Sequence, residues 1–401
     1  MKKVVIGVII LLVIVILLFF GLTVHLKERP APLPAIENPL PEDDVDLKVN
    51  GLKSNEYELC PASHITDFNG CAEYCANHVL WDGCRDWCIK NSGACKIKFV
   101  EPPFEKPSYW KIGSVGFWTD AYVDDIKEIN EINCNMLMIF FSTAPLSDGS
   151  LDVYRDEPKE VMELVFARGI AAAHEKGMQV VFDLEVGGPE AIPTEKREIF
   201  LENYKEFVID WAKFCEKHKV YAFNLNSELD NEFFVSEDCK ETCKDEAVST
   251  LAQNLLKEAR KYYSGRIGVG ILDTYSSDYN LTGYDFFTTN LPCGDGDVQG
   301  CLDFYGEAIL GANALKKKYN VPKFIIGEVD IFSENDATPE GKEIVQGFEV
   351  VSEQAEADFY DKFFERYASQ VDGITITYSD PLGIKTGPAK KVVGNWFKSV
   401  G

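Results

Sequence analysis

Two stretches of this sequence place a glutamate directly after an apolar run. Within residues 220–230 the apolar side chains give way to Asn226, Ser227 and Glu228, and residues 323–332 carry Glu328 after a similar run. Strands that are apolar in the middle and acidic at the C-terminal end are typical of a parallel barrel with its chemistry at one face. Two carboxyl groups on different strands can act as nucleophile and general acid/base. That division of roles is what cleavage of a glycosidic bond requires.

The segments around these glutamates alternate between strand-like and helix-like patterns. The strand-like segments are residues 111–118, 134–142, 178–185, 220–226, 266–273, 284–290, 323–329 and 373–378. The helix-like segments are residues 120–131, 158–176, 194–218, 244–263, 302–319, 353–370 and 388–397. This order predicts a (β/α)8 barrel, a TIM barrel, over residues 108–401. A doubly wound open sheet is the alternative, but no Gly-x-Gly-x-x-Gly follows the first strand to support a dinucleotide fold.

The predicted strand ends carry carboxylates, amides and aromatic rings. The candidates for binding a substrate are Trp118, Asp183, Asn226, Ser227, Tyr275, Asn290 and Tyr378. Histidine and lysine are absent from these ends, which argues against a metallohydrolase, a Ser-His acyl transferase and Schiff-base chemistry. We therefore expect neither a metal nor a cofactor. A salt bridge at the barrel rim is the structural alternative for either glutamate.

The chain resembles the clan A glycoside hydrolases, which are retaining (β/α)8 enzymes. The resemblance covers about residues 108–400 and rests on a glutamate after strand four and another at the end of strand seven. It implies that Glu228 is the general acid/base and Glu328 the nucleophile. Most of the clan has Asn where this sequence has Ser227, and some β-mannanase-like families carry a small hydroxyl residue there. The clan's strand-eight tryptophan corresponds to Tyr378.

The composition limits the partners and the compartment. The formal charge of −25 over 401 residues excludes a typical nucleic-acid-binding surface, which requires basic patches. Twelve cysteines are many for a reducing cytosol and favour an oxidising compartment.

The N-terminal segment has the pattern of a membrane anchor. Lys2 and Lys3 precede an apolar run over residues 4–24, which is long enough to cross a lipid bilayer as a helix. We expect an anchor over residues 1–28, with a cleaved signal peptide as the alternative. Residues 29–54 then form a proline-rich linker. The catalytic domain would lie outside the cell at the membrane.

A cysteine-rich module is expected over residues 55–100. It contains Cys60, Cys71, Cys75, Cys84, Cys88 and Cys95. Two of its cysteine pairs have i, i+4 spacing, which places both sulfurs on one face of a helix. Two antiparallel helices would be joined by nested bridges, Cys71 to Cys88 and Cys75 to Cys84, with Cys60 and Cys95 closing the base. The spacing resembles that of an α-hairpinin disulfide hairpin, and a structural zinc site is the alternative.

A further local disulfide is expected between Cys293 and Cys301, in a loop on the face that carries the glutamates. The acidic residues of that loop would be solvated or would bind calcium. These observations predict a membrane-anchored, extracellular retaining glycoside hydrolase that acts on a β-linked oligo- or polysaccharide. The alternatives are a surface barrel that binds carbohydrate without cleaving it, and a transglycosylase.

Overall fold

The computed structural model describes most of the chain from residue 60 onward. The described residues are 60–62, 65, 67–91, 94–115, 122–152, 158–187, 192–230, 243–272, 274, 278–290, 293, 297–329, 331, 351–378, 384 and 387–400. They all belong to one compact unit, Tyr57–Gly401.

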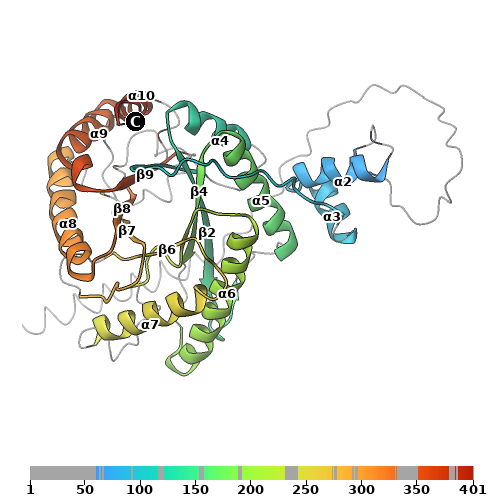
Figure 1. Cartoon of the computed structure of the whole chain (residues 1–401), viewed down its shortest axis with the longest axis horizontal. Coiled ribbons are helices and arrows are strands. Elements are labelled where there is room, and N and C mark those ends of the chain that lie inside the picture. Colours follow the sequence, from blue (N-terminus) through green and yellow to red (C-terminus); the bar gives the residue numbers. More distant parts are fainter. Residues whose placement is uncertain are drawn as a thin grey trace, which may run out of the picture. The chain divides into compact units, whose positions relative to one another are not determined.

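A closed ring of eight parallel strands forms the centre of the fold (Figure 1). The ring consists of β1 (Trp110–Val115), β2 (Met136–Pro145), β4 (Gln179–Val186), β5 (Ala222–Asn224), β6 (Arg266–Gly270), β7 (Phe286–Asn290), β8 (Lys323–Glu328) and β9 (Gly373–Thr377). The pairing of β1 with both β9 and β2 closes it. The remaining strand, β3 (Leu151–Asp152), pairs antiparallel with the end of β2. The predicted eight-stranded barrel is confirmed.

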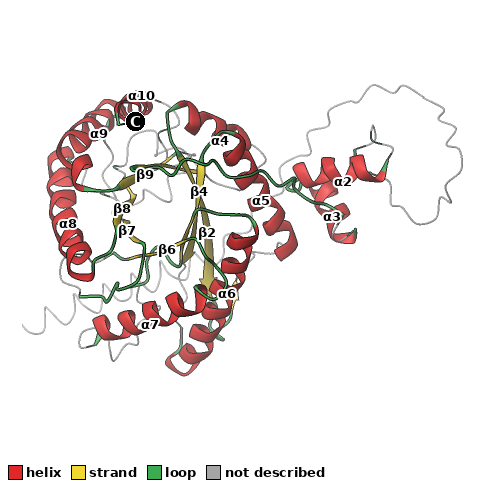
Figure 2. Cartoon of the chain, viewed as in Figure 1, coloured by secondary structure: helices red, strands yellow, loops and turns green. Residues whose placement is uncertain are grey.

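Helices surround the strands in the order that the sequence predicts (Figure 2). They are α4 (Tyr122–Glu131), α5 (Lys159–Glu175), α6 (Arg197–Lys217), α7 (Lys244–Ala259), α8 (Val298–Tyr319), α9 (Glu353–Tyr367) and α10 (Gly387–Ser399), with short 3-10 turns at Thr194–Lys196 and Ala368–Gln370. In the described residues between β6 and β7 the connection contains no helix.

The barrel interior is apolar near the strand starts and polar near the strand ends. The apolar layer consists of Trp110, Ile112, Met136, Met138, Val181, Ala222, Phe286 and Ile325. Because side chains alternate along a strand, residues two positions further along face the same interior. On β4 and β5 the next interior positions are Asp183 and Asn224, and on β7 the next is Thr288. The polar cluster therefore lies directly above a packed floor.

The cysteine module contains α2 (Phe68–Asn77) and α3 (Asp82–Lys90). Its three disulfides join Cys60 to Cys71, Cys75 to Cys84, and Cys88 to Cys95. The predicted inner bridge is confirmed, whereas the two outer pairings are wrong. Cys60 and Cys95 each bridge to the near end of the helix beside them, at sequence separations of only 11 and 7.

The module is joined to the barrel by an extended segment that runs over the helices. The backbone oxygen of Val100 lies 2.9 Å from Nδ1 of His174, and Gln179 donates to the backbone oxygens of Pro103 and Glu105 at 2.7 and 3.1 Å. Val79 of the module also belongs to the main hydrophobic core. These contacts fix the segment against α5 and the start of β4.

The predicted anchor over residues 4–24 lies outside the described residues. None of the described helices combines the length and the apolar character that crossing a bilayer requires.

Two cysteines of the barrel core, Cys134 and Cys215, are buried free thiols.

Candidate active site

The segment that follows β5 is held rigidly by backbone hydrogen bonds. The Ser227 amide donates to Leu184 O at 2.7 Å, and the Leu229 amide donates to Gly270 O at 2.9 Å. A Cβ atom on Gly270 would lie 1.9 Å from the Ser227 carbonyl oxygen, so only glycine permits this approach. Glu228, which is half-buried, is thus carried on a segment fixed to both neighbouring strands.

Asn226 shapes the turn that presents Glu228. Its side-chain oxygen accepts from the Glu228 amide at 2.7 Å, and its side-chain nitrogen donates to the Tyr204 hydroxyl at 2.7 Å. The Tyr204 hydroxyl in turn donates to Leu225 O at 2.6 Å. Asn226 is fully buried and directed toward α6. In the structure Asn226 supports the turn at Glu228, and the substrate contact that the sequence predicted stays a prediction.

An irregularity in strand pairing turns Glu328 toward the barrel interior. Thr289 pairs with Ile326, but the next residue, Asn290, pairs with Glu328. Gly327 is therefore an additional residue of β8 that has no partner on β7. Without this bulge, Glu328 would have the opposite orientation to Ile325, which faces the interior floor. The shift places Glu328 beside Asn290 on the interior face. A Cβ atom on Gly327 would lie 2.3 Å from Asn290 Oδ1, which leaves no room for another residue.

Asp183 forms the base of the polar cluster. Asn224 donates to Asp183 Oδ1 at 2.8 Å and to Thr288 Oγ1 at 3.2 Å, and these contacts link β4, β5 and β7. The Asp183 side chain is buried, and burial raises the pKa of its carboxyl well above the usual value. The charges of Glu185 and Glu228 raise this pKa further, while the Asn224 hydrogen bond lowers it. Asp183 therefore lies near Glu228, as expected for two predicted site residues, and near Glu185, which the predicted site does not include.

Two buried polar atoms of this cluster lack a hydrogen-bond partner. They are Ser227 Oγ and Asn224 Oδ1, each on a residue that is fully buried. Since buried polar atoms normally find a partner, such atoms indicate places for water or a ligand. Ser227 thus keeps an unused hydroxyl beside Glu228.

Other predicted residues have different surroundings. The Tyr378 hydroxyl donates to Glu128 Oε2 of α4 at 2.6 Å, so its side chain is directed outward between helices. The structure therefore lends no support to a substrate contact by Tyr378. Asp230, which also follows β5, accepts from the Leu272 amide at 2.7 Å and joins two loops. Trp118 and Tyr275 lie outside the described residues.

The loop after β7 is closed by the predicted disulfide between Cys293 and Cys301. Asp297, one of the acidic residues considered for calcium, is the N-cap of α8 and accepts from the Gln299 and Gly300 amides. Among the described residues the sole group of cysteine, histidine and acidic side chains close enough to hold a metal is Cys60, Cys71 and Cys75. Cys60 and Cys71 are already joined by a disulfide.

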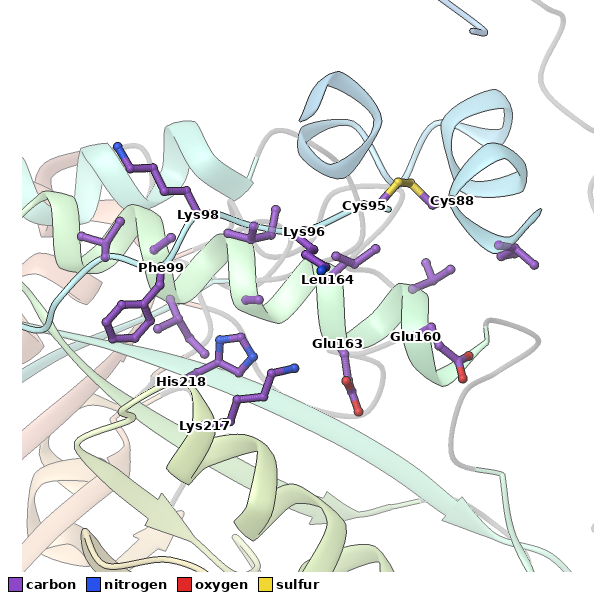
Figure 3. A pocket seen from close by; sticks show the side chains of 17 residues that line it. Cys88, Cys95, Lys96, Lys98, Phe99, Glu160, Glu163, Leu164, Lys217 and His218 are labelled. Atoms are coloured by element: carbon purple, nitrogen blue, oxygen red, sulfur yellow. A yellow bond between two sulfur atoms is a disulfide. The ribbon is translucent and has the colours of Figure 1, made fainter. Parts of the chain in front are cut away.

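A cavity of about 790 Å³ lies away from the strand ends, between the cysteine module, α5 and the end of α6 (Figure 3). Figure 3 shows Phe99 and His218 on one side of it and Leu164 on another. Burial lowers the pKa of His218 to about 4, with a smaller contribution from the Lys217 charge. His218 is therefore neutral near pH 7. The two carboxyl groups that line this cavity, Glu160 and Glu163, come from one helix, α5, and not from two barrel strands.

Two residues of the polar cluster, Asn224 and Thr288, are not among the predicted substrate contacts. Asn224 is the last residue of β5 and Thr288 lies inside β7, so side-chain alternation along the strand was needed to assign them to the interior. In the sequence Val220–Asn226, Asn224 is two positions after Ala222, an interior residue of the apolar floor. A polar residue at an interior position was the available signal.

Solved structures of glycoside hydrolases share this fold. A GH113 beta-1,4-mannanase aligns with a TM-score of 0.54 and 15% identity, over 76% of this chain and 100% of its own. The GH113 beta-mannanase AaManA from Alicyclobacillus acidocaldarius gives 0.54 and 14%, over 76% and 99%. An endo-beta-1,4-mannanase from Thermotoga petrophila gives 0.51 and 12%, over 74% and 77%. At these identities the likeness establishes a common fold, so the resemblance to clan A barrels is confirmed at that level.

No protein-family model matches the chain, and no curated protein matches it by sequence.

Proposed function

We propose that this protein is a retaining glycoside hydrolase that cleaves β-linked saccharides. The observation that carries the proposal is the pair of glutamates, one following the fourth barrel strand and one ending the seventh. The β8 bulge turns Glu328 toward the interior, and the charge of Glu228 acts on Asp183 in the same interior. Both glutamates thus belong to one end of one barrel.

In this proposal Glu328 attacks the anomeric carbon while Glu228 protonates the departing oxygen. Water then hydrolyses the glycosyl ester, with Glu228 acting as the base that accepts its proton. The Asn226 hydrogen bond to the Glu228 amide keeps the acid/base in place through both steps. Ser227 offers a free hydroxyl where a sugar hydroxyl could bind.

The first substrates to test are β-1,4-mannans and manno-oligosaccharides. Three solved structures with this barrel carry the name mannanase in their titles. A small hydroxyl residue before the acid/base agrees with the mannanase-like pattern noted in the sequence. Gluco- and galacto-oligosaccharides serve as the comparison.

The test is turnover by the wild-type protein and by Glu328→Gln, with Glu365→Gln as a control. Glu365 is an exposed residue of α9, so its substitution should leave turnover unchanged. Glu328→Gln should remove turnover without unfolding the protein. Equal activity of Glu328→Gln and wild type would contradict the proposal.

A barrel that binds saccharide without cleaving it is the second candidate, and Ser227 in place of asparagine favours it. It would bind manno-oligosaccharides with the same affinity in wild type and Glu328→Gln. It would also release no product on prolonged incubation with any of the three oligosaccharide types.

We further propose that residues 4–24 anchor the enzyme in a membrane, with the barrel outside the cell. The four disulfides among described residues favour an oxidising compartment. Full-length protein should sediment with membranes, and deletion of residues 1–28 should release it. A mature chain beginning near Lys27 would instead indicate a cleaved signal peptide.

A further inference from the structure

We propose that Asp183 is a positioning residue that stays neutral and protonated, and that it holds Asn224 in place without adding a charge to the carboxyl groups above it. The proposal rests on the proposed function for its meaning in catalysis. Asp183 itself touches no reacting atom in this account, because it forms the base of the cluster beneath the glutamates.

The first observation is that Asp183 has little to stabilise a negative charge. Its side chain is 2% exposed, and it accepts one hydrogen bond, from Asn224, at 2.8 Å. None of the ion pairs among the described residues includes it. A buried carboxylate without a cation is costly, and such a group usually takes up a proton instead.

The second observation is that other acidic groups lie near Asp183. Glu185 lies two residues further along the same face of β4, and the charges of Glu185 and Glu228 both act on Asp183. From α6, the Tyr204 phenol is the further titratable group, and burial raises its pKa, so it stays neutral. From β2 and β7, Asp183 meets Phe140 in register and, through Asn224, Thr288, which do not titrate. Among the residues that the structure describes, the charges that act on Asp183 are therefore both negative.

A third observation excludes one way of compensating for these charges. Within the part of the chain that is described, no three carboxyl groups lie close enough to share a metal ion. A proton on Asp183 relieves the repulsion. It also makes the carboxyl a hydrogen-bond donor while its other oxygen still accepts from Asn224.

The consequence for catalysis concerns Glu228. An ionised Asp183 would repel the Glu228 carboxylate and raise the pKa of the acid/base. A neutral Asp183 leaves that pKa to be set by Glu328 and the substrate, and it provides only geometry. An ionised Asp183 would therefore shift the alkaline limb of the pH–rate profile, whereas a neutral Asp183 would not.

The experiment compares Asp183→Asn with Asp183→Ala. Asparagine is neutral and keeps a donor and an acceptor, so kcat/KM should stay within about threefold of wild type, with the alkaline limb unmoved. Alanine removes one of the two hydrogen bonds that the Asn224 amide donates, and only the bond to Thr288 remains, so kcat/KM should fall about 10- to 100-fold. An alkaline limb that moves to lower pH in Asp183→Asn would show that Asp183 is ionised and would overturn the proposal.

A measurement without catalysis separates this inference from the proposed function. If Asp183 holds its proton in the folded state, wild type loses stability relative to Asp183→Asn as pH rises from about 4 to 8. Stability of the two proteins that stays parallel over this range would contradict the inference even if the enzyme is active. An inactive wild type that still diverges from Asp183→Asn would sink only the proposed function.

If Asp183→Asn does not fold, carbon-13 NMR of aspartate-labelled wild type gives the answer. One carboxyl carbon should keep the chemical shift of a neutral acid at about pH 7, far above the usual aspartate pKa. The absence of any such signal would overturn the inference.

Discussion

The two ends of the barrel are built from the same strands but carry opposite chemistry. At the strand starts, Arg266 and Lys323 lie over the Trp110 ring at 6.0 and 5.8 Å, and Arg266 lies 5.0 Å from the Tyr221 ring. At the strand ends the interior carries Asp183, Asn224, Glu228 and Glu328 instead. One end is packed with rings and cations, and the other gathers acidic groups.

This difference indicates where stability and function are divided. Trp110 is fully buried in the apolar floor and packs against Phe286 at 5.1 Å between ring centroids. Side chains at the polar end contribute less to the stability of the fold, because acidic groups that repel one another are gathered there. In barrels of this kind the strand ends supply catalysis, whereas the strand starts supply stability. Substitutions at the two ends should therefore affect different measurements.

The largest effect is expected for Glu228→Ala at the acidic end. Natural saccharides need protonation of the leaving oxygen, so their turnover should fall about 10²–10⁴-fold. Aryl glycosides with acidic phenols need no such help and should still glycosylate the enzyme at near wild-type rates. Steady-state and burst kinetics on both substrate types check this. Equal losses on the two types would argue against an acid/base role.

Trp110→Ala should produce the largest loss of stability at the opposite end. Removing this buried ring should cost about 3–5 kcal/mol in the free energy of unfolding, measured by denaturant titration. Trp81→Ala is the matched control, because Trp81 is 45% exposed. The folded fraction of Trp110→Ala should keep its kcat. If Trp110→Ala had normal stability but no activity, the proposed division between a stabilising end and a catalytic end would be contradicted.

Gly327→Ala tests whether the β8 bulge orients Glu328. The added methyl would meet Asn290 Oδ1, so the bulge must shift at a cost of about 1–3 kcal/mol. Because Glu328 moves with it, kcat should fall more than stability alone explains. Gly394→Ala on α10 is the control, since its nearest neighbour would lie at an ordinary 3.5 Å. Unchanged kcat in Gly327→Ala would show that the bulge does not orient Glu328 for catalysis.

The smallest effect is expected for Arg266→Leu. The guanidinium over Tyr221 contributes about 0.5–1 kcal/mol at a half-buried site, so the unfolding free energy should fall by about that amount. Catalysis should not change. Lys391→Leu, an exposed substitution on α10, should have no measurable effect on either quantity. A fall in kcat for Arg266→Leu would mean that the two ends are coupled.

The sequence predicted the fold well because the barrel repeats one local pattern eight times. Apolar runs at regular intervals define the strands, and Glu228 and Glu328 stood out as polar exceptions at their ends. The disulfide pairings around Cys60 and Cys95 could not be predicted, since six neighbouring cysteines allow many pairings and helix packing decides among them.

The orientations of single side chains were also beyond the sequence. Tyr378 lies at the end of a strand, as Glu328 does, but without a bulge its side chain is directed outward to Glu128. Strand parity decides this, and one residue of shift reverses it. The bulge at Gly327 depends on close contact with Asn290, which only the assembled barrel reveals.

The most direct test of the central claim is chemical rescue of Glu328→Ala. The small side chain leaves space where an external anion can attack the anomeric carbon. If Glu328 is the nucleophile, turnover should be lost and added azide should restore it, giving a glycosyl azide of inverted anomeric configuration. Restored turnover with retained configuration, or an active Glu328→Ala without azide, would contradict the account.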